Sequence, residues 1–153
     1  DIGDVVQTTV RSLQRELSGR KVTVEIAEKL PLARLDFTLM QQALSNLLLN
    51  AVMHTPAGTP IAVHAATEGR DFILRVVDDG PGLPPELLPR VFEKFIRATN
   101  APAGGSGLGL AIVKGFVEAQ GGTISVQNKL SGGAMFTIRL PQSESPQSLE
   151  ALA

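Results

Sequence analysis

The chain has 153 residues, of which 43% are hydrophobic, so it is long and apolar enough for one domain with a buried core. Its 14 Lys and Arg residues are balanced by 15 Asp and Glu residues, which excludes a strongly basic surface for nucleic acid or anionic lipid. The absence of cysteine excludes disulfides, thiolate zinc sites and cysteine nucleophiles, so any anionic ligand must be held by other local groups.

The first third of the chain is predicted to contain two helices and two short strands. Apolar residues recur at helical spacing over 6–17, and alternation predicts a strand at 22–26. A second short strand is predicted at 32–35, after a proline. Asp36 is placed to cap a long helix that runs to about His54, where a Thr-Pro sequence ends it.

The remaining elements are predicted as two hairpins on either side of a helix. Strand-like runs at 61–66 and 72–77 are joined by a short turn. Apolar residues over 108–119 recur at helical spacing, and two final strands are predicted at 123–128 and 134–140.

Short turns between neighbouring strands favour antiparallel pairing, so we predict an α+β fold with a mixed, mostly antiparallel sheet. About three helices are expected to cover one face of this sheet. The domain is predicted to span 1–141. Residues 142–153, which are rich in Ser, Gln, Glu and Pro, are predicted to form a flexible C-terminal tail.

The long predicted helix carries a polar stripe in which Gln42, Asn46, Asn50 and His54 follow one another at steps of four residues. A solvent-facing stripe is one interpretation, although such stripes usually carry Lys and Glu. The alternative is a ligand site, because each carboxamide oxygen can coordinate Mg²⁺ or accept a hydrogen bond from water.

A second motif begins with Asp78 and Asp79, which directly follow a predicted strand and precede a turn that contains Gly80 and Gly82. An acidic turn explains this pattern, since Asp and Gly are common turn formers. The pattern also fits a base site, in which a buried Asp78 carboxylate accepts a hydrogen bond from an adenine amino group and the glycines let the backbone approach the ring. Asp79 is expected to be solvated.

A glycine-rich third motif precedes the last predicted helix. Amide groups at Gly105, Gly107, Leu108 and Gly109 can converge on an anion, helped by the positive end of the helix. The spacing excludes both a P-loop and the dinucleotide fingerprint, and a flexible loop without a ligand is the alternative.

The fourth motif combines aromatic and basic side chains. Phe92 and Phe95 are predicted to anchor one edge of the adjoining loop in the core. Arg97, and with it Lys94, has the charge to bind terminal phosphates, and a solvated charged surface is the alternative.

In this order, the four motifs resemble those of the ATP-binding family shared by histidine kinases, type II topoisomerases, one class of heat-shock chaperones and mismatch-repair ATPases. Residues 46–51 are similar to its N box, 78–82 to its first glycine box, 92–95 to its F box and 105–110 to its second glycine box. Residues 132–137 look like its closing strand. The resemblance implies a two-layer α/β sandwich, the Bergerat fold, with ATP bound under a mobile lid.

The resemblance also implies roles for individual residues. Asn50 is implied as the Mg²⁺ ligand and Asp78 as the adenine reader, under a lid at 96–106. Asn46 stands where hydrolysing members of the family carry a Glu, and because a carboxamide is no general base at neutral pH, efficient hydrolysis is not expected. The implied catalytic residues are Asn46, Asn50 and Arg97, and the implied nucleotide ligands are Asn50, His54, Asp78, Gly80, Gly82, Lys94, Gly105, Gly107, Leu108, Gly109 and Thr137.

The chain departs from the pattern of sensor kinases at two points. Met53 occupies a place where a Lys is common, so one phosphate contact is missing or is supplied by His54 or Lys94. The dimerising helices with their acceptor histidine are not found in this sequence, because His54 belongs to the nucleotide motif and His64 to a strand without an adjacent acidic residue. Autophosphorylation within the chain is therefore not expected.

The function implied by the resemblance is that of the catalytic, ATP-binding domain of a bacterial sensor histidine kinase in two-component signal transduction. Such a domain binds Mg-ATP and donates the γ-phosphoryl group to a histidine on the dimerisation domain of the same parent protein. A cognate response regulator is the further partner. An anti-sigma-type serine kinase, which the F box disfavours, and a non-enzymatic ATP-sensing module are the alternatives.

The sequence also suggests where this domain works. It begins at Asp1 without a methionine, and it contains no apolar run of the roughly 20 residues that span a bilayer. We expect a cytoplasmic domain without direct contact with membrane or nucleic acid, belonging to a longer parent associated with the inner membrane. Residues 79–85 and the short lid are similar to the potassium-sensing kinases of the Kdp system.

Overall fold

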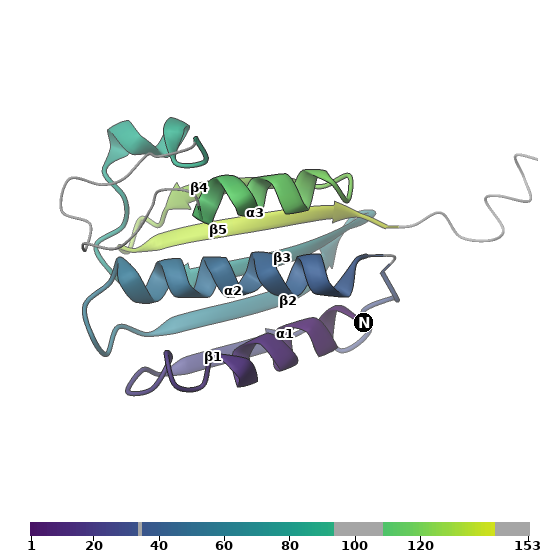
Figure 1. Cartoon of the computed structure of the whole chain (residues 1–153), viewed down its shortest axis with the longest axis horizontal. Coiled ribbons are helices and arrows are strands. Elements are labelled where there is room, and N and C mark those ends of the chain that lie inside the picture. The colour runs from purple at the N-terminus through teal and green to yellow at the C-terminus, as the bar shows by residue number, and fades with distance from the viewer. Residues whose placement is uncertain (34, 94–108, 143–153) are drawn as a thin grey trace, which may run out of the picture.

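The computed structural model describes residues 1–33, 35–93 and 109–142, and these form a mixed sheet of five strands with helices on one face (Figure 1). The strands are β1 (Val22–Ile26), β2 (Ile61–Glu68), β3 (Asp71–Asp78), β4 (Thr123–Asn128) and β5 (Ala134–Pro141). Their order across the sheet is β1-β2-β3-β5-β4. The β1–β2 pair is parallel and the other pairs are antiparallel, which confirms the predicted mixed, mostly antiparallel sheet.

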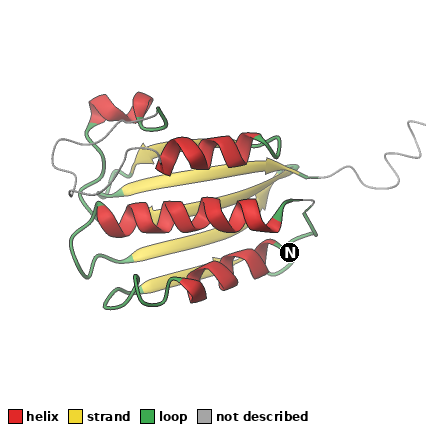
Figure 2. Cartoon of the chain, viewed as in Figure 1, coloured by secondary structure: helices red, strands yellow, loops and turns green. Residues whose placement is uncertain are grey.

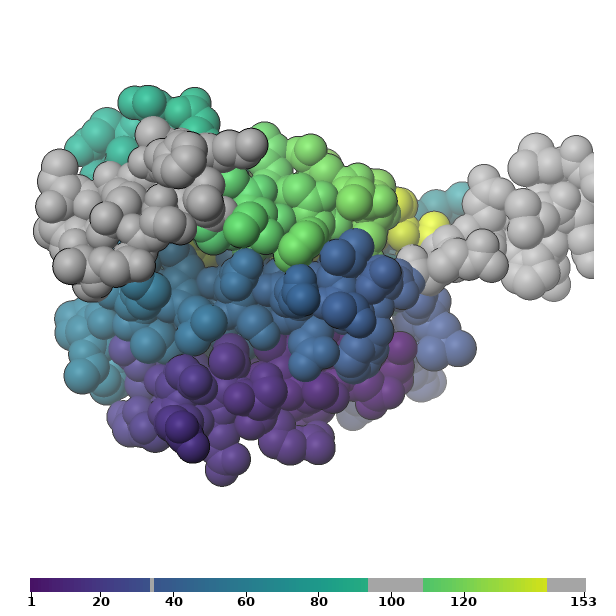
Figure 3. Space-filling view, in the orientation of Figure 1, coloured from purple at the N-terminus to yellow at the C-terminus, as the bar shows by residue number. Residues whose placement is uncertain are grey.

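Helices α1 (Ile2–Ser12), α2 (Phe37–Met53) and α3 (Gly109–Glu118) lie side by side in one layer over the sheet (Figure 2). The short 3₁₀ helix η1 (Pro85–Arg90) follows the turn after β3. The space-filling view shows α1, α2 and α3 packed closely across this face (Figure 3). The predicted α+β sandwich with about three helices on one face is therefore confirmed. None of the helices in the described ranges is long and apolar enough to cross a membrane.

The core lies between the helix layer and the sheet because alternate strand residues point toward the helices. In β5, the buried residues alternate from Ala134 to Leu140, and in β2 they alternate from Ile61 to Ala65. Leu44, Leu47 and Leu48 of α2 are fully buried in the same core. Each such leucine contributes about 1.5–3 kcal/mol by leaving water, so α2 is firmly fixed over the sheet.

Helix α2 forms as predicted because both of its ends are satisfied. The Asp36 carboxylate accepts a hydrogen bond from the Leu39 N–H at 3.0 Å, which caps the N-terminus. At the other end, Nη2 of Arg20 donates to the Val52 carbonyl oxygen at 3.0 Å, which satisfies an acceptor in the last turn. The predicted end at about His54 is confirmed.

Two predictions for the first third were wrong. Helix α1 ends at Ser12, and Leu13 and Leu17 reach the core from the turns that follow it. The predicted strand at 32–35 does not form: its described residues are coil, and Leu32 is 78% exposed. The described residues of this segment join none of the five strands, although β1 at the edge of the sheet has β2 as its single neighbour.

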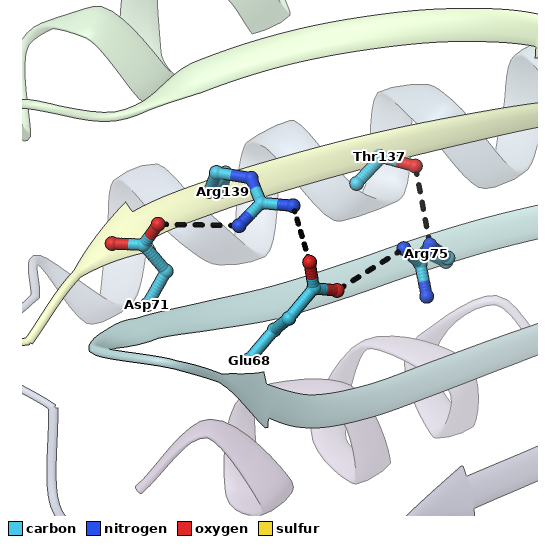
Figure 4. Close-up of polar contacts among 5 residues, drawn as sticks. All are labelled: Glu68, Asp71, Arg75, Thr137 and Arg139. Carbon is cyan, nitrogen blue, oxygen red and sulfur yellow. Dashed lines mark hydrogen bonds and ion pairs between the residues drawn. The ribbon is translucent and has the colours of Figure 1, made fainter.

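The face of the sheet without helices carries a polar network at the β2–β3 turn (Figure 4). Arg139 contacts the Asp71 carboxylate at 3.2 Å and the Glu68 carboxylate at 3.3 Å, and Glu68 also pairs with Arg75 at 3.8 Å. The hydrogen bond to Asp71, followed by that to Glu68, raises the pKa of Arg139 above its ordinary value. Arg139 therefore stays positively charged and bridges β5 to the β2–β3 turn.

Candidate functional site

A pocket opens at the end of the sheet opposite the Arg139 network, where β3 ends beside the start of β2. Four segments contribute to it: the C-terminal end of α2, the end of β3, the turn after β3 and the first residues of β5. The lining residues are Asn50, His54, Thr55, Asp78, Gly82, Leu83, Ala134 and Phe136. Four sequence-predicted site residues, from two separate motifs, therefore meet in one pocket.

Asp78 is the acidic group of this pocket, and it is only 6% exposed. Its Oδ1 accepts hydrogen bonds from the Gly80 N–H at 2.9 Å and the Ala134 N–H at 3.3 Å. Both hydrogen bonds found for this side chain within the described residues end on Oδ1, which leaves Oδ2 for a ligand. A carboxylate held in this way is a fixed acceptor that suits a donor such as an amino group.

Asn50 and His54 come from the last turn of α2 and its cap, and both line the pocket. The His54 N–H donates to the Asn50 carbonyl oxygen at 3.0 Å, so the two residues follow one continuous helical path. Asn46 is half-buried one turn earlier on α2 and is not among the residues that line the pocket in the described part of the chain. The polar stripe therefore reaches the pocket at its C-terminal end.

Arg20 fixes the corner where α2 leaves the pocket, and nothing in the sequence pattern indicated this role. Its Nη1 donates to Thr55 Oγ1 at 2.7 Å and to the Thr59 carbonyl oxygen at 3.2 Å. Thr55 in turn donates from Oγ1 to the Ala51 carbonyl oxygen at 2.6 Å. A guanidinium with several donors in a rigid plane is suited to join such separate acceptors.

The turn after β3 is held from the β4–β5 side. The Asn128 side chain forms two hydrogen bonds with the main chain of Leu83. Lys129 Nζ pairs with Asp79 Oδ1 at 2.6 Å. The expectation that Asp79 is simply solvated was therefore incomplete, because its exposed carboxylate has a lysine partner.

The comparisons with known proteins assign the chain to a family. The sequence matches the family described as "Histidine kinase-, DNA gyrase B-, and HSP90-like ATPase" over residues 35–144, which is most of the chain. The chain belongs to this family.

Its relatives are sensor kinases. The sensor protein KdpD of Escherichia coli strain K12 is 39% identical over 145 residues, which cover 94% of this chain and 16% of KdpD. A structure of the mycobacterial sensor histidine kinase MprB matches with a TM-score of 0.84 at 30% identity, covering 95% of this chain and 98% of that one. Full-length ShkA in complex with AMPPNP matches with a TM-score of 0.79 at 28% identity, over 95% of this chain and 31% of that one.

These matches identify the chain as a kinase domain of the sensor histidine kinase type. This chain matches about a sixth of the length of KdpD and nearly all of the solved MprB chain. The predicted membership of the ATP-binding family and the predicted Bergerat fold are confirmed.

The motifs of the kinase domain fall partly inside the described residues. Phe92 packs edge-on against Phe136, with ring centroids 6.2 Å apart at an interplanar angle of 81°, which agrees with its predicted role as a core anchor. Gly109 opens α3. The predicted lid at 96–106 lies outside the described residues, and so do six predicted residues in or beside it: Lys94, Phe95, Arg97, Gly105, Gly107 and Leu108.

Thr137, which the resemblance implied as a nucleotide ligand, is not among the described residues that line the pocket. Phe136 points to the helix side and lines the pocket, so the alternation of β5 places Thr137 on the other face of the sheet. There its hydroxyl accepts a hydrogen bond from Nε of Arg75 at 3.4 Å, as Figure 4 shows. The Thr137 side chain therefore faces away from the pocket.

Proposed function

We propose that this kinase domain binds Mg-ATP in the described pocket and donates its γ-phosphoryl group to a histidine of a separate acceptor domain. One observation carries the proposal, namely that Asp78 and Asn50, from motifs 28 positions apart in the numbering, line the same pocket. Asp78 is a fixed carboxylate acceptor, which suits an adenine amino group. Asn50 is a neutral oxygen ligand, which suits a phosphate-bound Mg²⁺.

Asp78 recognises the adenine in this proposal. Main-chain donors from Gly80 and Ala134 hold Oδ1, so the amino group meets an acceptor whose orientation is already set. A hydrogen bond to a charged acceptor contributes about 1.5–3 kcal/mol. Gly82 lines the pocket with its main chain, so the base can approach the backbone closely there.

Asn50 fits as the protein's contribution to a magnesium site. In residues 1–33, 35–93 and 109–142, no group of three or more His, Asp or Glu side chains could hold a metal ion. Magnesium commonly keeps waters and phosphate oxygens as most of its ligands, so a single carboxamide oxygen suits it. When bound, Mg²⁺ neutralises charge on the phosphate oxygens.

The remaining groups position the phosphates and disfavour hydrolysis. Asn46 lies one helical turn before Asn50, and its carboxamide can hold a hydrogen-bonded water but cannot take a proton from it, which favours transfer over hydrolysis. We include His54 and Gly80 in the nucleotide site. The same proposal gives phosphate contacts to Lys94, Arg97, Gly105, Gly107, Leu108 and Gly109.

The acceptor is proposed to be a histidine on the dimerisation domain of the same parent protein, which then passes the phosphoryl group to a response regulator. The acceptor nitrogen supplies the nucleophile, so the kinase domain itself contributes positioning and charge neutralisation. We further propose that the parent is a Kdp-type potassium sensor kinase associated with the inner membrane; the 39% identity to the sensor protein KdpD supports the Kdp-type assignment.

A calorimetric titration with a non-hydrolysable ATP analogue, with and without Mg²⁺, tests the pocket. Asp78→Asn is expected to weaken binding roughly 10–100-fold, because the amino group loses a charged acceptor. Asp79→Asn is the matched control: its exposed pair with Lys129 contributes little, so affinity stays within about twofold. Equal affinities of the two variants would contradict the assignment of Asp78.

Phosphotransfer tests the reaction. The kinase domain is incubated with labelled ATP and the histidine-bearing helical hairpin of its parent protein, and acid-labile, base-stable label on the hairpin is measured. Label on a serine-bearing partner instead would favour the serine-kinase alternative. Saturable ATP binding without label on any acceptor would favour an ATP-sensing module.

A further inference from the structure

The turn after β3 is tied to the last residue of β4 by one side chain. Asn128 accepts a hydrogen bond from the Leu83 N–H at 2.9 Å through Oδ1 and donates from Nδ2 to the Leu83 carbonyl oxygen at 2.8 Å. The two residues are 45 positions apart and both are half-buried. A carboxamide that bonds both main-chain groups of one residue replaces the partner strand that this turn lacks.

The contact continues onto the neighbouring residue. A Cβ atom added to Gly82 would lie 2.8 Å from Asn128 Oδ1, so the turn rests directly on the carboxamide. Gly82 and Leu83 both line the pocket, beside Asp78. Asn128 therefore fixes the wall of the pocket, although it does not itself line the pocket.

We propose that Asn128 is a positioning residue that sets the selectivity of the pocket for adenine, by holding the Gly82–Leu83 wall against the base. This inference rests on the proposed binding of ATP. Asp78 distinguishes adenine only if the base is seated so that its amino group meets the carboxylate. A wall that is free to shift lets the base move, and the contact with Asp78 is then lost.

The side-chain chemistry makes the proposal specific to asparagine. Asn128→Asp keeps an acceptor for the Leu83 N–H but has no donor for the Leu83 carbonyl oxygen, and it places a negative charge beside that oxygen. Asn128→Ala removes both bonds. Gln127→Ala is a matched control, because Gln127 is the exposed neighbouring carboxamide on the opposite face of β4.

The test is the ratio of affinities for a non-hydrolysable ATP analogue and the corresponding inosine analogue, in which a carbonyl replaces the amino group. Thermal unfolding of each variant sets a temperature at which it is fully folded, and the milder Asn128→Asp serves if Asn128→Ala is too unstable. Wild type is expected to prefer the ATP analogue. Both Asn128 variants are expected to lower that preference about 5–10-fold, mainly by weakening the ATP analogue, while Gln127→Ala leaves it unchanged.

The outcomes separate this inference from the proposed function. Wild-type protein that binds neither analogue would overturn both. Wild-type protein that prefers the ATP analogue, with Asn128 variants that weaken both analogues by the same factor, would show a purely structural role and overturn the inference alone. Asn128 variants that bind both analogues with wild-type affinity would likewise overturn the inference alone.

Discussion

Asp78 receives its orientation from two segments that are far apart in the sequence. The Gly80 N–H comes from the turn that follows the residue itself, whereas the Ala134 N–H comes from the start of β5. The pairing of β3 with β5 brings that second donor into place, so the carboxylate is aligned only in the folded sheet. Recognition of a base by this residue therefore depends on the closing strand as well as on the first glycine box.

Asn50→Ala is predicted to remove most of the Mg²⁺ dependence of nucleotide binding. The alanine lacks the oxygen ligand, so affinity with Mg²⁺ should fall about tenfold, while affinity in EDTA changes little. Titration of a non-hydrolysable ATP analogue under both conditions measures this. Gln42→Ala, on the exposed part of the same polar stripe, is the control and should retain the wild-type ratio. A full Mg²⁺ effect in Asn50→Ala would exclude Asn50 as the ligand.

Gly133→Ala is predicted to destabilise the domain by roughly 3 kcal/mol or more. Gly133 has a φ of 97°, and a Cβ atom there would overlap the Asp78 carbonyl oxygen, so both strain and collision contribute. Gly69→Ala is the control, since its φ is 62° but no atom lies within 4 Å of the added Cβ, and it should cost about 1–2 kcal/mol. Urea unfolding compares the two, and equal losses would show that the overlap relaxes freely.

Some residues of the site belong to a recognisable local sequence motif, and others do not. Asn50, His54, Asp78 and Gly82 belong to compact motifs, and the resemblance of these motifs, in this order, to the ATP-binding family implied that they meet. Asn128 carries no such signal, because its partner is 45 positions away and an Asn at a strand end is also common in turns. Thr137 was implied only by its place in the closing strand, and the alternation of β5 turns its side chain to the face opposite Phe136.

At the scale of elements, α2 connects the fold to the pocket. Its buried leucines fix the helix over the sheet, and its last turn carries Asn50 and His54 to the pocket. Capping and apolar periodicity are local properties, so the bounds of α2 were predicted closely. Residues 32–35 had a strand-like composition as well, but a strand also needs a neighbour with free backbone groups, and the sequence does not reveal which edges are available.

Arg20→Met is predicted to lower the free energy of unfolding by about 1–3 kcal/mol, because carbonyl oxygens of Val52 and Thr59 lose a charged donor at the end of α2. Arg20→Lys keeps the charge but not the planar donors, so an intermediate loss is expected. Chemical denaturation measures both. Arg15→Met, at an exposed position after α1, is the control and should stay within about 0.5 kcal/mol of wild type. A loss of stability at Arg20 no larger than that of the control would show that its hydrogen bonds do not stabilise the end of α2.

On the scale of the whole molecule, the polar network and the pocket occupy opposite ends of the sheet. The network joins β5 to the β2–β3 turn, and the pocket joins α2, β3 and β5 at the other end. Since both ends use β3 and β5, the pocket depends on the pairing of these two central strands. A nucleotide that binds there should therefore stabilise the folded domain as a unit.

This coupling predicts the size of a thermal shift. A Mg²⁺-bound, non-hydrolysable ATP analogue at 100 times its dissociation constant adds about 2.7 kcal/mol to the stability of a protein that binds it only when folded. For a domain of this length, that corresponds to a rise in Tm of roughly 5–10 °C in scanning calorimetry. Asp78→Asn at the same ligand concentration should show less than about half of the rise, because Oδ1 still accepts its main-chain hydrogen bonds while the base contact is weakened. An equal rise in the variant would mean that the nucleotide stabilises the domain through its phosphates alone, and the base would then have to lie outside the Asp78 pocket.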